Sequence, residues 1–300
     1  MMTYVVPEAL TRISVRAFLK QKGVSGSLFR TIKHHGNLCV NGQPAHAVGT
    51  LLHGGDVLSY DLPPTKQDIL PERIPLDIRY EDDDLLIVNK PAGMLVHPTP
   101  SCIHGTLANA VLGLYRSRGL DTAFHCVHRL DRLTSGLILA AKRPEIQHLL
   151  STKDGKLFHR EYLAMAEGVL EPSAGIIDAP IARDPDSIIT RRVAPEGKPA
   201  ITRYRTEKVW EREGQRYSLL RLSLVTGRTH QIRVHLSYLG HPLLGDDLYG
   251  GSRMLIQRQA LHAERIFLTH PLSGQPLDLH AELPWDMQRL CVSNFAPVLS

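Results

Sequence analysis

The chain has 300 residues, of which 43% are hydrophobic, and a formal net charge of +5 at pH 7. This length can bury the core of one large domain and of a small one. No window approaches the roughly 18 apolar residues of a membrane span, and the N-terminus lacks the basic and apolar regions of a signal peptide. We therefore expect a soluble cytoplasmic protein with no membrane partner.

The charge is spread unevenly along the chain. Residues 1–60 hold six Lys and Arg residues against two acidic ones, a net charge of +4, and residues 61–84 carry a net charge of −5. The remaining residues, 85–300, carry +6. Two basic regions joined by an acidic segment favour a polyanionic partner, although so modest an excess also fits an ordinary soluble protein.

The cysteines and histidines show no metal-binding pattern. None of the 16 histidines belongs to a His-Glu-x-x-His sequence or has a cysteine at the spacing of a zinc site. The four cysteines are scattered and form no Cys-x-x-Cys pair: Cys39, Cys102, Cys126 and Cys291. This usage argues against a disulfide framework or a zinc knuckle, suits a reducing cytoplasm and predicts no metal.

Residues 1–60 are predicted to form a compact module of two helices and short strands. Residues 12–38 carry apolar side chains at helical spacing on both sides of a glycine-rich break. Residues 38–44 contain an Asn-Gly dipeptide after a short apolar run, which indicates a hairpin. A Gly-Gly-Asp turn then precedes a last strand, residues 57–60.

This module resembles the RNA-binding domain named after ribosomal protein S-four, chiefly through Val40-Asn41-Gly42 and Gly55-Asp56. That family usually opens on Arg-Leu-Asp, where this chain has Arg12-Ile13-Ser14. The resemblance implies contact with RNA, and Arg30 and Lys33 are the candidate residues for it. The alternative is a basic appendage that serves only packing.

Residues 61–73 contain three prolines among polar residues, which predicts an extended linker. Residues 74–300 form the predicted large domain, in which strands alternate with helices. Strands are predicted at residues 85–88, 137–141 and 217–225, and helices at residues 106–114 and 228–239. The chain shows no fixed-period repeat and no low-complexity tract.

One carboxylate stands out in the segment from His128 to Lys142. Asp131 lies between Arg129 and Arg132, before a Thr-Ser-Gly sequence and a continuous apolar run. A loop that carries a charged side chain into a buried strand is a common way to place a reactive group on a rigid frame. The alternative is a solvated aspartate paired with a neighbouring arginine, and this segment alone favours that second interpretation.

Three further segments change the balance. With the Asp131 segment, they resemble in wording and order the RluA-type family of RNA pseudouridine synthases: Asn-Lys-Pro-Ala-Gly-Met-Leu-Val-His-Pro at 89–98, Arg-Glu-Tyr-Leu-Ala-Met-Ala-Glu-Gly at 160–168 and Thr-Gly-Arg-Thr-His-Gln-Ile-Arg-Val-His at 226–235. Gly245-Asp246-Asp247-Leu248-Tyr249-Gly250 and Leu261-His262-Ala263 extend the likeness. One such motif carries a real risk of a false positive, but four in the right order make coincidence remote.

The resemblance implies an α+β enzyme with a mixed, largely antiparallel sheet, flanked by helices and with a central basic cleft, beside the small N-terminal α/β RNA-binding module. It implies the isomerisation of uridine to pseudouridine in structured RNA, with ribosomal RNA as the expected substrate and transfer RNA as the alternative. The base is cut from its sugar, turned and rejoined through carbon 5. This reaction is redox-neutral and needs no group carrier, so no cofactor is expected.

Three residues are the candidates for catalysis. Moving a base between two attachments needs a nucleophile that holds one fragment, and the resemblance assigns this role to Asp131, with attack on the sugar or on the base left open. It places Arg233 opposite, where a buried guanidinium would keep the carboxylate charged through a bidentate pair. It assigns Tyr162 as the aromatic platform for the uracil, although a tyrosine in a strand is by itself more often a core residue.

Four basic residues of the large domain are candidates for RNA contact. Arg129 matches a family residue that enters the RNA stack when the uridine leaves it, and a phosphate contact is an equal alternative. Lys90 and Lys142 are candidate phosphate contacts, with a solvated lysine as the equal alternative. Arg228, with His230, is expected to support the cleft, and a packed pair of the two is at least as good an interpretation.

A function of another class is open as well: a non-catalytic RNA-binding or ribosome-assembly protein that retains the synthase fold. The presence together of Asp131, Tyr162 and Arg233 argues against this alternative. Release of hydrogen from carbon 5 of uridine separates the two.

Overall fold

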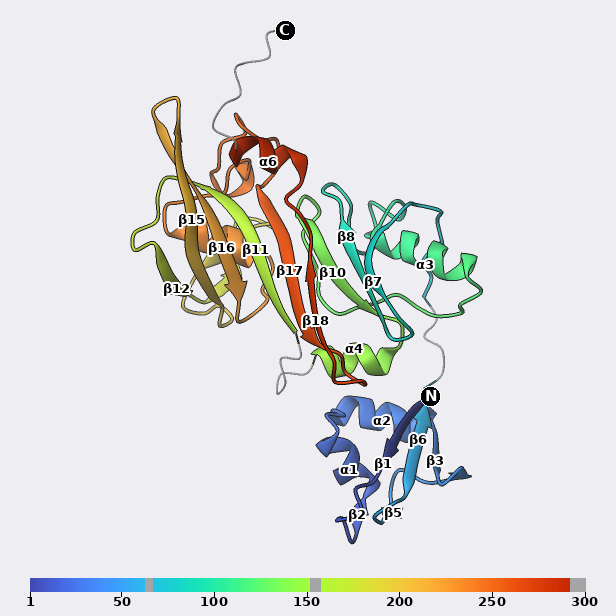
Figure 1. The fold of residues 1–300 in the computed structure, drawn as a ribbon. Helices are drawn as coiled ribbons and strands as arrows, with labels where there is room; N and C mark the ends of the chain where they lie inside the picture. Colours follow the sequence, from blue (N-terminus) through green and yellow to red (C-terminus); the bar gives the residue numbers. More distant parts are fainter. Residues whose placement is uncertain (63–66, 152–157, 292–300) are drawn as a thin grey trace.

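The computed structural model describes residues 1–62, 67–151 and 158–291. They form a small N-terminal sheet with two helices and a large sheet of ten strands, and helix α4 (Pro144–Ser151) lies between the two bodies (Figure 1). Within these described ranges, no helix is both long and apolar enough to cross a membrane.

The N-terminal sheet is antiparallel and has the order β1-β6-β3-β4. Its strands, together with the separate pair of β2 and β5, are β1 (Met2–Val5), β2 (Ile13–Ser14), β3 (Asn37–Val40), β4 (Gln43–Pro44), β5 (Leu51–Leu52) and β6 (Val57–Asp61). The predicted hairpin is present as β3 and β4, and Asn41 and Gly42 at its turn both have positive φ, as a type I′ turn requires. The sequence does not predict β1, because four residues at a chain end give too short a pattern.

The two N-terminal helices are α1 (Val15–Gln21) and α2 (Gly26–His35). Each begins after a serine whose hydroxyl accepts a backbone N–H of the first turn, Ser14 from Ala17 and Ser25 from Leu28, both at 3.2 Å. These caps explain why the chain breaks and restarts within the predicted helical region.

The large sheet has the order β12-β15-β16-β11-β17-β10-β8-β7, with β18 beside β17 and β9 beside β10. The strands are β7 (Asp77–Glu81), β8 (Leu85–Lys90), β9 (His125–Cys126), β10 (Ser135–Ala141), β11 (Phe158–Glu167), β12 (Ala174–Asp178), β15 (Ile201–Arg212), β16 (Gln215–Leu224), β17 (Leu261–Thr269) and β18 (Pro276–His280). All pairs but one are antiparallel. The predicted α+β class with a mixed, largely antiparallel sheet flanked by helices is confirmed.

The single parallel pair, β10 with β17, joins two halves of the large sheet. It spans two register positions, Ser135 with His262 and Gly136 with Ala263, after which β18 takes the place of β10 beside β17. Gly136 has φ of 113°, and a Cβ on it would stand 2.3 Å from the Ala263 carbonyl oxygen. Only glycine allows two backbones this close, which explains the glycine of the Thr-Ser-Gly sequence.

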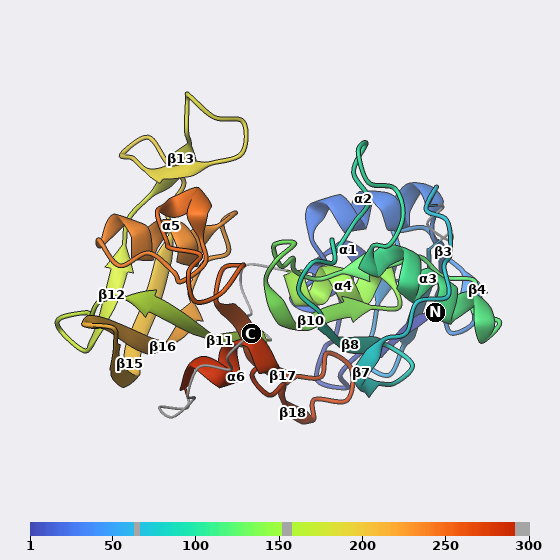
Figure 2. The same ribbon diagram turned by 90° about the horizontal axis from the view of Figure 1, so that it is seen from above.

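Helices α3 (Leu107–Ser117) and α5 (Gln231–Tyr238) pack on one face of the large sheet, one over each half (Figure 2). The opposite face shares a hydrophobic cluster with α4 and with the N-terminal helices. Ser25 N–H donates to His148 Nε2 at 3.0 Å, and Arg143 donates to the Met1 carbonyl oxygen at 3.1 Å. The N-terminal body is thus docked against the large sheet through α4.

The remaining elements are a hairpin of β13 (Ile181–Arg183) and β14 (Arg191–Val193), the 3₁₀ turn η1 (Asp247–Tyr249) and the C-terminal helix α6 (Trp285–Cys291). Part of the predicted linker lies outside the described residues. Asp61 still belongs to β6, whereas residues 67–73 have no helix or strand. Residues 67–73 are attached to the large domain, since Gln67 bonds both backbone groups of Phe124 and Glu72 N–H donates to the Asn109 carbonyl oxygen. This portion therefore packs on the large domain.

Candidate active site

Asp131 lies on the loop that enters β10, at the join between the two halves of the sheet. Its carbonyl oxygen accepts the Thr134 N–H at 3.1 Å, and its side chain is 26% exposed. The next residues are fastened to the start of β17: Thr134 Oγ1 accepts from Gln259 at 3.3 Å, and Ser135 Oγ lies 2.9 Å from His262 Nδ1. The carboxylate is therefore held on a rigid loop and remains accessible.

Arg233 of α5 stands opposite Asp131, with its Nη1 3.1 Å from Asp131 Oδ2. The expected bidentate pair between these two residues is wrong, because the bidentate partner is Asp246, which accepts from Nε at 2.7 Å and from Nη2 at 2.8 Å. The side chains of Arg233 and Asp246 are 7% and 1% exposed. Asp246 thus fixes the plane of the guanidinium, and Asp131 receives the one remaining edge.

The electrostatic balance at Arg233 favours its charge. Burial lowers the pKa of the guanidinium, but hydrogen bonds and charge from Asp246 and then Asp131 outweigh it, so the net pKa lies above its ordinary value. The Arg233 guanidinium also lies 4.9 Å from the centroid of the Tyr249 ring. A permanently charged guanidinium therefore stands 3.1 Å from one oxygen of Asp131.

The loop before α5 is held by a buried glutamine rather than by a longer helix. Gln231 Oε1 accepts from Thr226 Oγ1 and from Arg228 N–H, both at 2.9 Å, and Gln231 Nε2 donates to the Ile201 carbonyl oxygen at 3.0 Å. The helix predicted from residue 228 therefore begins at Gln231. This arrangement turns Arg233 toward the interior of the site.

His230 precedes α5 in the left-handed conformation, with φ of 58° and ψ of 19°. Its Nδ1 lies 2.7 Å from the Tyr249 hydroxyl, and its Nε2 lies 3.8 Å from Asp131 Oδ1. The Tyr249 hydroxyl also accepts the Arg191 N–H at 3.0 Å. A histidine and a tyrosine thus stand behind the oxygen of Asp131 that Arg233 does not contact.

Tyr162 of β11 is 3% exposed and belongs to the same apolar cluster as Leu130 and Ile232. Burial raises the pKa of its phenol, Arg160 opposes this shift, and the charge of Asp131 adds to it. Leu130 and Ile232 adjoin Asp131 and Arg233 in the chain, so the Tyr162 ring lies beside the same site. The Arg160 guanidinium itself lies 5.3 Å from the centroid of the Phe158 ring.

Lys90 is not a phosphate contact, and that prediction is corrected. The side chain is 0% exposed, and its Nζ donates to the carbonyl oxygens of Pro91 and Met94, both at 2.9 Å, and of Arg132 at 3.2 Å. In its charged form, Lys90 therefore uses all three ammonium hydrogens inside the protein. Lys90 ties the residues after β8 to the loop that carries Asp131.

The other predicted RNA contacts are differently placed. Arg129 is exposed beside Asp131, and Arg228 is exposed with its Nε donating to the Pro199 carbonyl oxygen at 3.0 Å. Lys142 follows the far end of β10 and pairs with Glu81 at 2.8 Å, about 20 Å of strand away from Asp131. Lys142 is therefore too far from Asp131 to contact RNA at the site. Arg30 and Lys33 are exposed on α2 of the N-terminal body.

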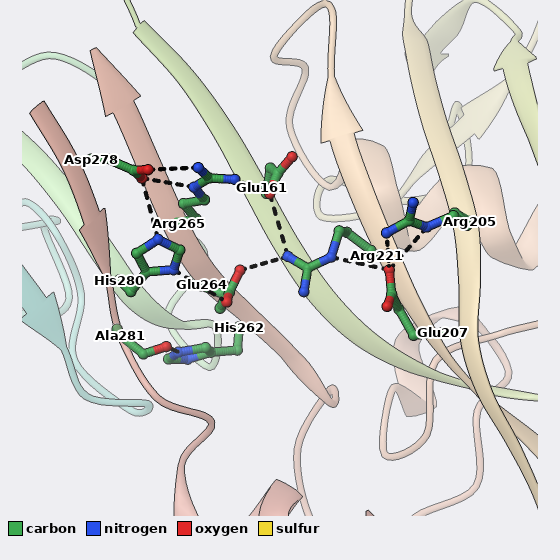
Figure 3. Close-up of polar contacts among 10 residues, drawn as sticks. All are labelled: Glu161, Arg205, Glu207, Arg221, His262, Glu264, Arg265, Asp278, His280 and Ala281. Atoms are coloured by element: carbon green, nitrogen blue, oxygen red, sulfur yellow. Dashed lines mark hydrogen bonds and ion pairs between the residues drawn. The ribbon is translucent and has the colours of Figure 1, made fainter. Parts of the chain in front are cut away.

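The opposite face of the large sheet carries a charge network centred on Arg221 (Figure 3). Arg221 contacts Glu161, Glu207 and Glu264 at 3.3, 3.1 and 2.7 Å. Arg265 extends the network to Asp278 through two hydrogen bonds, at 2.7 and 2.6 Å. These pairs link β15, β16, β11, β17 and β18 on the face away from Asp131.

Two residues of the Gly-Asp-Asp-Leu-Tyr-Gly segment, residues 245–250, have roles that the sequence alone does not assign. The structure makes Asp246 the anchor of Arg233 and Tyr249 the partner of His230. The motif itself was the available signal, and only the fold shows which of its two aspartates points inward.

The chain is similar to known proteins of one family. A family model described as RNA pseudouridylate synthase matches residues 84–238. The chain is 41% identical to the uncharacterized RNA pseudouridine synthase YjbO of Bacillus subtilis over 93% of this chain and 98% of that protein. The chain belongs to the RNA pseudouridine synthase family.

Further relatives agree with this assignment. Ribosomal large subunit pseudouridine synthase D of Haemophilus ducreyi is 43% identical over 73% of this synthase and 71% of its own length. The solved structure of human RNA pseudouridylate synthase domain containing 1 matches with a TM-score of 0.56 and 26% identity, over 69% of this chain and 83% of that one. The predicted family, the enzyme class and RNA as the substrate are therefore confirmed.

Proposed function

We propose that this synthase converts uridine to pseudouridine in ribosomal RNA and that Asp131 is its nucleophile. The observation that carries the proposal is the contact of Asp131 Oδ2 with Arg233, whose other two donors are held by buried Asp246. A carboxylate that is partly exposed and paired with a fixed, permanently charged guanidinium is both charged and reachable.

The reaction requires one bond of the uridine to break and another to form, with one fragment held in place. The C1′–N1 bond of uridine breaks, the base turns, and a C1′–C5 bond forms, so one fragment must stay attached while the other moves. A carboxylate can hold either the sugar or the base through this interval. The proton lost from C5 balances the proton gained by N1, so no co-reactant is consumed.

We propose that Tyr162 and Arg129 handle the displaced base and the gap that it leaves. Tyr162 is 3% exposed, so a uracil would reach its ring only after side chains at the site move. Flipping a nucleotide costs a few kcal/mol, and a planar cation that fills the vacancy offsets part of that cost. Arg129, exposed two residues before Asp131, is placed for this role.

Ribosomal RNA is proposed as the substrate because relatives at 43% identity carry the name ribosomal large subunit pseudouridine synthase D. The N-terminal module, residues 1–60, is proposed to add contacts with RNA through Arg30 and Lys33. Mapping pseudouridines in RNA from cells that lack this protein would decide the substrate. Loss of sites in transfer RNA alone would contradict the ribosomal assignment.

Release of tritium from RNA labelled at carbon 5 of uridine tests the chemistry, because this hydrogen leaves only when C5 joins the sugar. Asp131→Asn should abolish release and leave RNA affinity within a few-fold, since affinity comes mainly from phosphate contacts. Asp121→Asn, at an exposed carboxylate elsewhere, is the matched control and should keep full activity. Release by Asp131→Asn would remove the proposed role, and no release by the unaltered protein from any cellular RNA would favour a non-catalytic RNA-binding protein.

A further inference from the structure

The two oxygens of Asp131 have different surroundings. Oδ2 receives the Arg233 Nη1 hydrogen bond at 3.1 Å, and Arg233 cannot move away because Asp246 holds its other donors. Oδ1 faces His230 Nε2 at 3.8 Å, too far for a hydrogen bond. Within the described residues, Oδ1 accepts no hydrogen bond. Oδ1 is therefore the oxygen free to form a bond.

The hydrogen bonds around Tyr249 assign the proton of His230. The Tyr249 oxygen accepts the Arg191 N–H, so its own hydrogen is available for His230 Nδ1, 2.7 Å away. This is the arrangement in which the phenolic hydrogen also has an acceptor. A neutral imidazole that accepts at Nδ1 carries its proton at Nε2, the nitrogen that faces Asp131.

The surroundings of His230 keep it neutral. Burial lowers its pKa, the charge of Asp131 opposes this, Arg233 and Arg191 lower it further, and Asp246 raises it, with a net pKa below the ordinary 6.5. His230 is also in the left-handed backbone region, which a non-glycine residue adopts rarely and mostly where the surrounding structure requires it.

We propose that Asp131 reacts through Oδ1 and that the Nε2–H of His230 donates a hydrogen bond to the uracil as the base leaves the sugar. Tyr249 is the positioning residue that sets the tautomer. The inference rests on the proposed role of Asp131 as the nucleophile.

The chemistry of the leaving base explains the need for such a donor. When the C1′–N1 bond breaks, its electron pair stays with the uracil, which spreads negative charge over N1 and the carbonyl oxygens. An atom that bonds to Oδ1 enters the space that His230 faces. The neutral Nε2–H of His230 can then donate a hydrogen bond to the negative charge that develops on the uracil. His230 keeps its proton throughout, and the proton count of the reaction is unchanged.

Substitutions that remove or retain the donor test the proposal by single-turnover tritium release. His230→Leu should slow release about 100-fold, the usual effect of losing one donor to a developing charge. His230→Gln, whose amide N–H reaches nearly as far, should recover at least part of the rate. His230→Asn should stay slow, because its side chain is too short, although asparagine suits the left-handed backbone better. RNA affinity should remain unchanged in all three.

Backbone strain offers a contrasting account. If His230 serves only the fold, His230→Asn should match the unaltered enzyme and His230→Gln should be the slower of the two. That ranking would overturn the proposal. Tritium release by His230→Leu at half the normal rate or more would overturn it as well. If Asp131→Asn releases no tritium in the same assay, the proposed nucleophile is still supported. Release by Asp131→Asn would remove both proposals together.

The pH profile gives a readout that folding alone does not move. A cationic His230 would close onto Oδ1 and neutralise the reacting oxygen, so the rate should fall on the acid side as His230 takes up a proton. The charged and polar groups that face His230 and govern its protonation are Asp131, Arg233, Arg191, Asp246 and Tyr249. In His230→Gln the acid limb should move to lower pH, and an unchanged limb would exclude His230 as its source.

Nitrogen-15 spectra of histidine-labelled protein observe the tautomer directly. His230, identified by the signals missing in His230→Gln, should show a protonated Nε2 and an unprotonated Nδ1. Tyr249→Phe keeps the ring beside Arg233 but removes the hydroxyl, so it should mix the two tautomers and slow release several-fold. A proton on Nδ1 in the unaltered protein would contradict the assignment.

Discussion

Arg233 and Arg221 lie on opposite faces of the large sheet, and each contacts more than one carboxylate. Arg221 is 27% exposed, and its partners Glu161, Glu207 and Glu264 are 32%, 28% and 16% exposed. Arg233 is 7% exposed, and Asp246 is 1% exposed. Water screens the ion pairs of Arg221 more strongly than those of Arg233. The same kind of side chain therefore links strands on one face and forms a buried, fixed ion pair beside Asp131 on the other.

The largest effect should come from removing the buried partner of Arg233. Asp246→Ala leaves a buried guanidinium without its bidentate acceptor and should lower the free energy of unfolding by about 3–5 kcal/mol. Asp246→Asn, which keeps an oxygen, should fold better but slow tritium release about 100-fold, because the guanidinium loses its fixed position. Urea unfolding and single-turnover kinetics measure the two effects.

Asp278→Ala is the matched control for that experiment. Asp278 also accepts two hydrogen bonds from an arginine, Arg265, but their side chains are 41% and 35% exposed. The free energy of unfolding should change by about 0–1 kcal/mol, with turnover unaffected. Equal losses in Asp246→Ala and Asp278→Ala would break the distinction between the two faces.

Lys90 extends the comparison between buried and exposed basic side chains, because this buried amine has carbonyl oxygens as partners in place of a carboxylate. Burial lowers its pKa from 10.5 to about 7, with the charge of Asp131 acting in the other direction. Between these two values the unfolded chain holds the proton and the folded chain does not, so stability should rise with pH across that window.

Lys90→Met should remove this rise in stability and leave three carbonyl oxygens without a donor, at a cost of about 1–3 kcal/mol. Urea unfolding of both proteins at several pH values between 7 and 9.5 would measure the slope. Parallel curves for the two proteins would show that Lys90 keeps its proton in the folded state.

A smaller effect is expected on the exposed face. Arg221→Met should change the free energy of unfolding by about 1 kcal/mol or less and leave tritium release unchanged, since its ion pairs are screened by solvent. High salt should reduce even this difference. A loss as large as that of Asp246→Ala would show that the network acts as a buried one.

The smallest effect on RNA binding and activity should follow changes to Arg30 and Lys33, exposed cations that pair with no carboxylate of the described residues. Arg30→Gln and Lys33→Gln together should weaken RNA binding a few-fold and reduce the slope of log affinity against log salt by about one per lost phosphate contact. The tritium-release rate at saturating RNA should stay the same. An unchanged salt slope would assign the N-terminal body to packing rather than to RNA.

Local patterns in the sequence predicted helices α1, α2, α3 and α5 but only a minority of the strands in the described residues. The apolar run before Lys90, the Asn41-Gly42 turn and the apolar spacing in α1 and α2 all depend on residues close together in the chain. The chemistry at Asp131, by contrast, was predicted from ordered motifs and not from periodicity. No local pattern predicts β1, or the start of α5 at Gln231, which a side chain decides.

Contacts between distant segments were beyond prediction for a physical reason. Asp246 and Asp247 are adjacent and identical in type, and only the fold buries the first beside Arg233 and leaves the second exposed. Lys90 follows an apolar run and precedes a proline, which fits a surface lysine equally well. One of its three acceptors, the Arg132 carbonyl oxygen, is brought into place by a loop 42 residues later in the chain.

The two-position join of β10 and β17 has a consequence for synthesis of the enzyme. Asp131 and Arg233 are separated by 102 residues, and the anchor Asp246 comes 13 residues later still. A growing chain therefore exposes Asp131 long before Arg233 and Asp246 have been translated. The contact between Asp131 and Arg233 forms only when the second half of the sheet docks beside Gly136, so a polypeptide that ends before Arg233 lacks the pair on which the proposed chemistry depends.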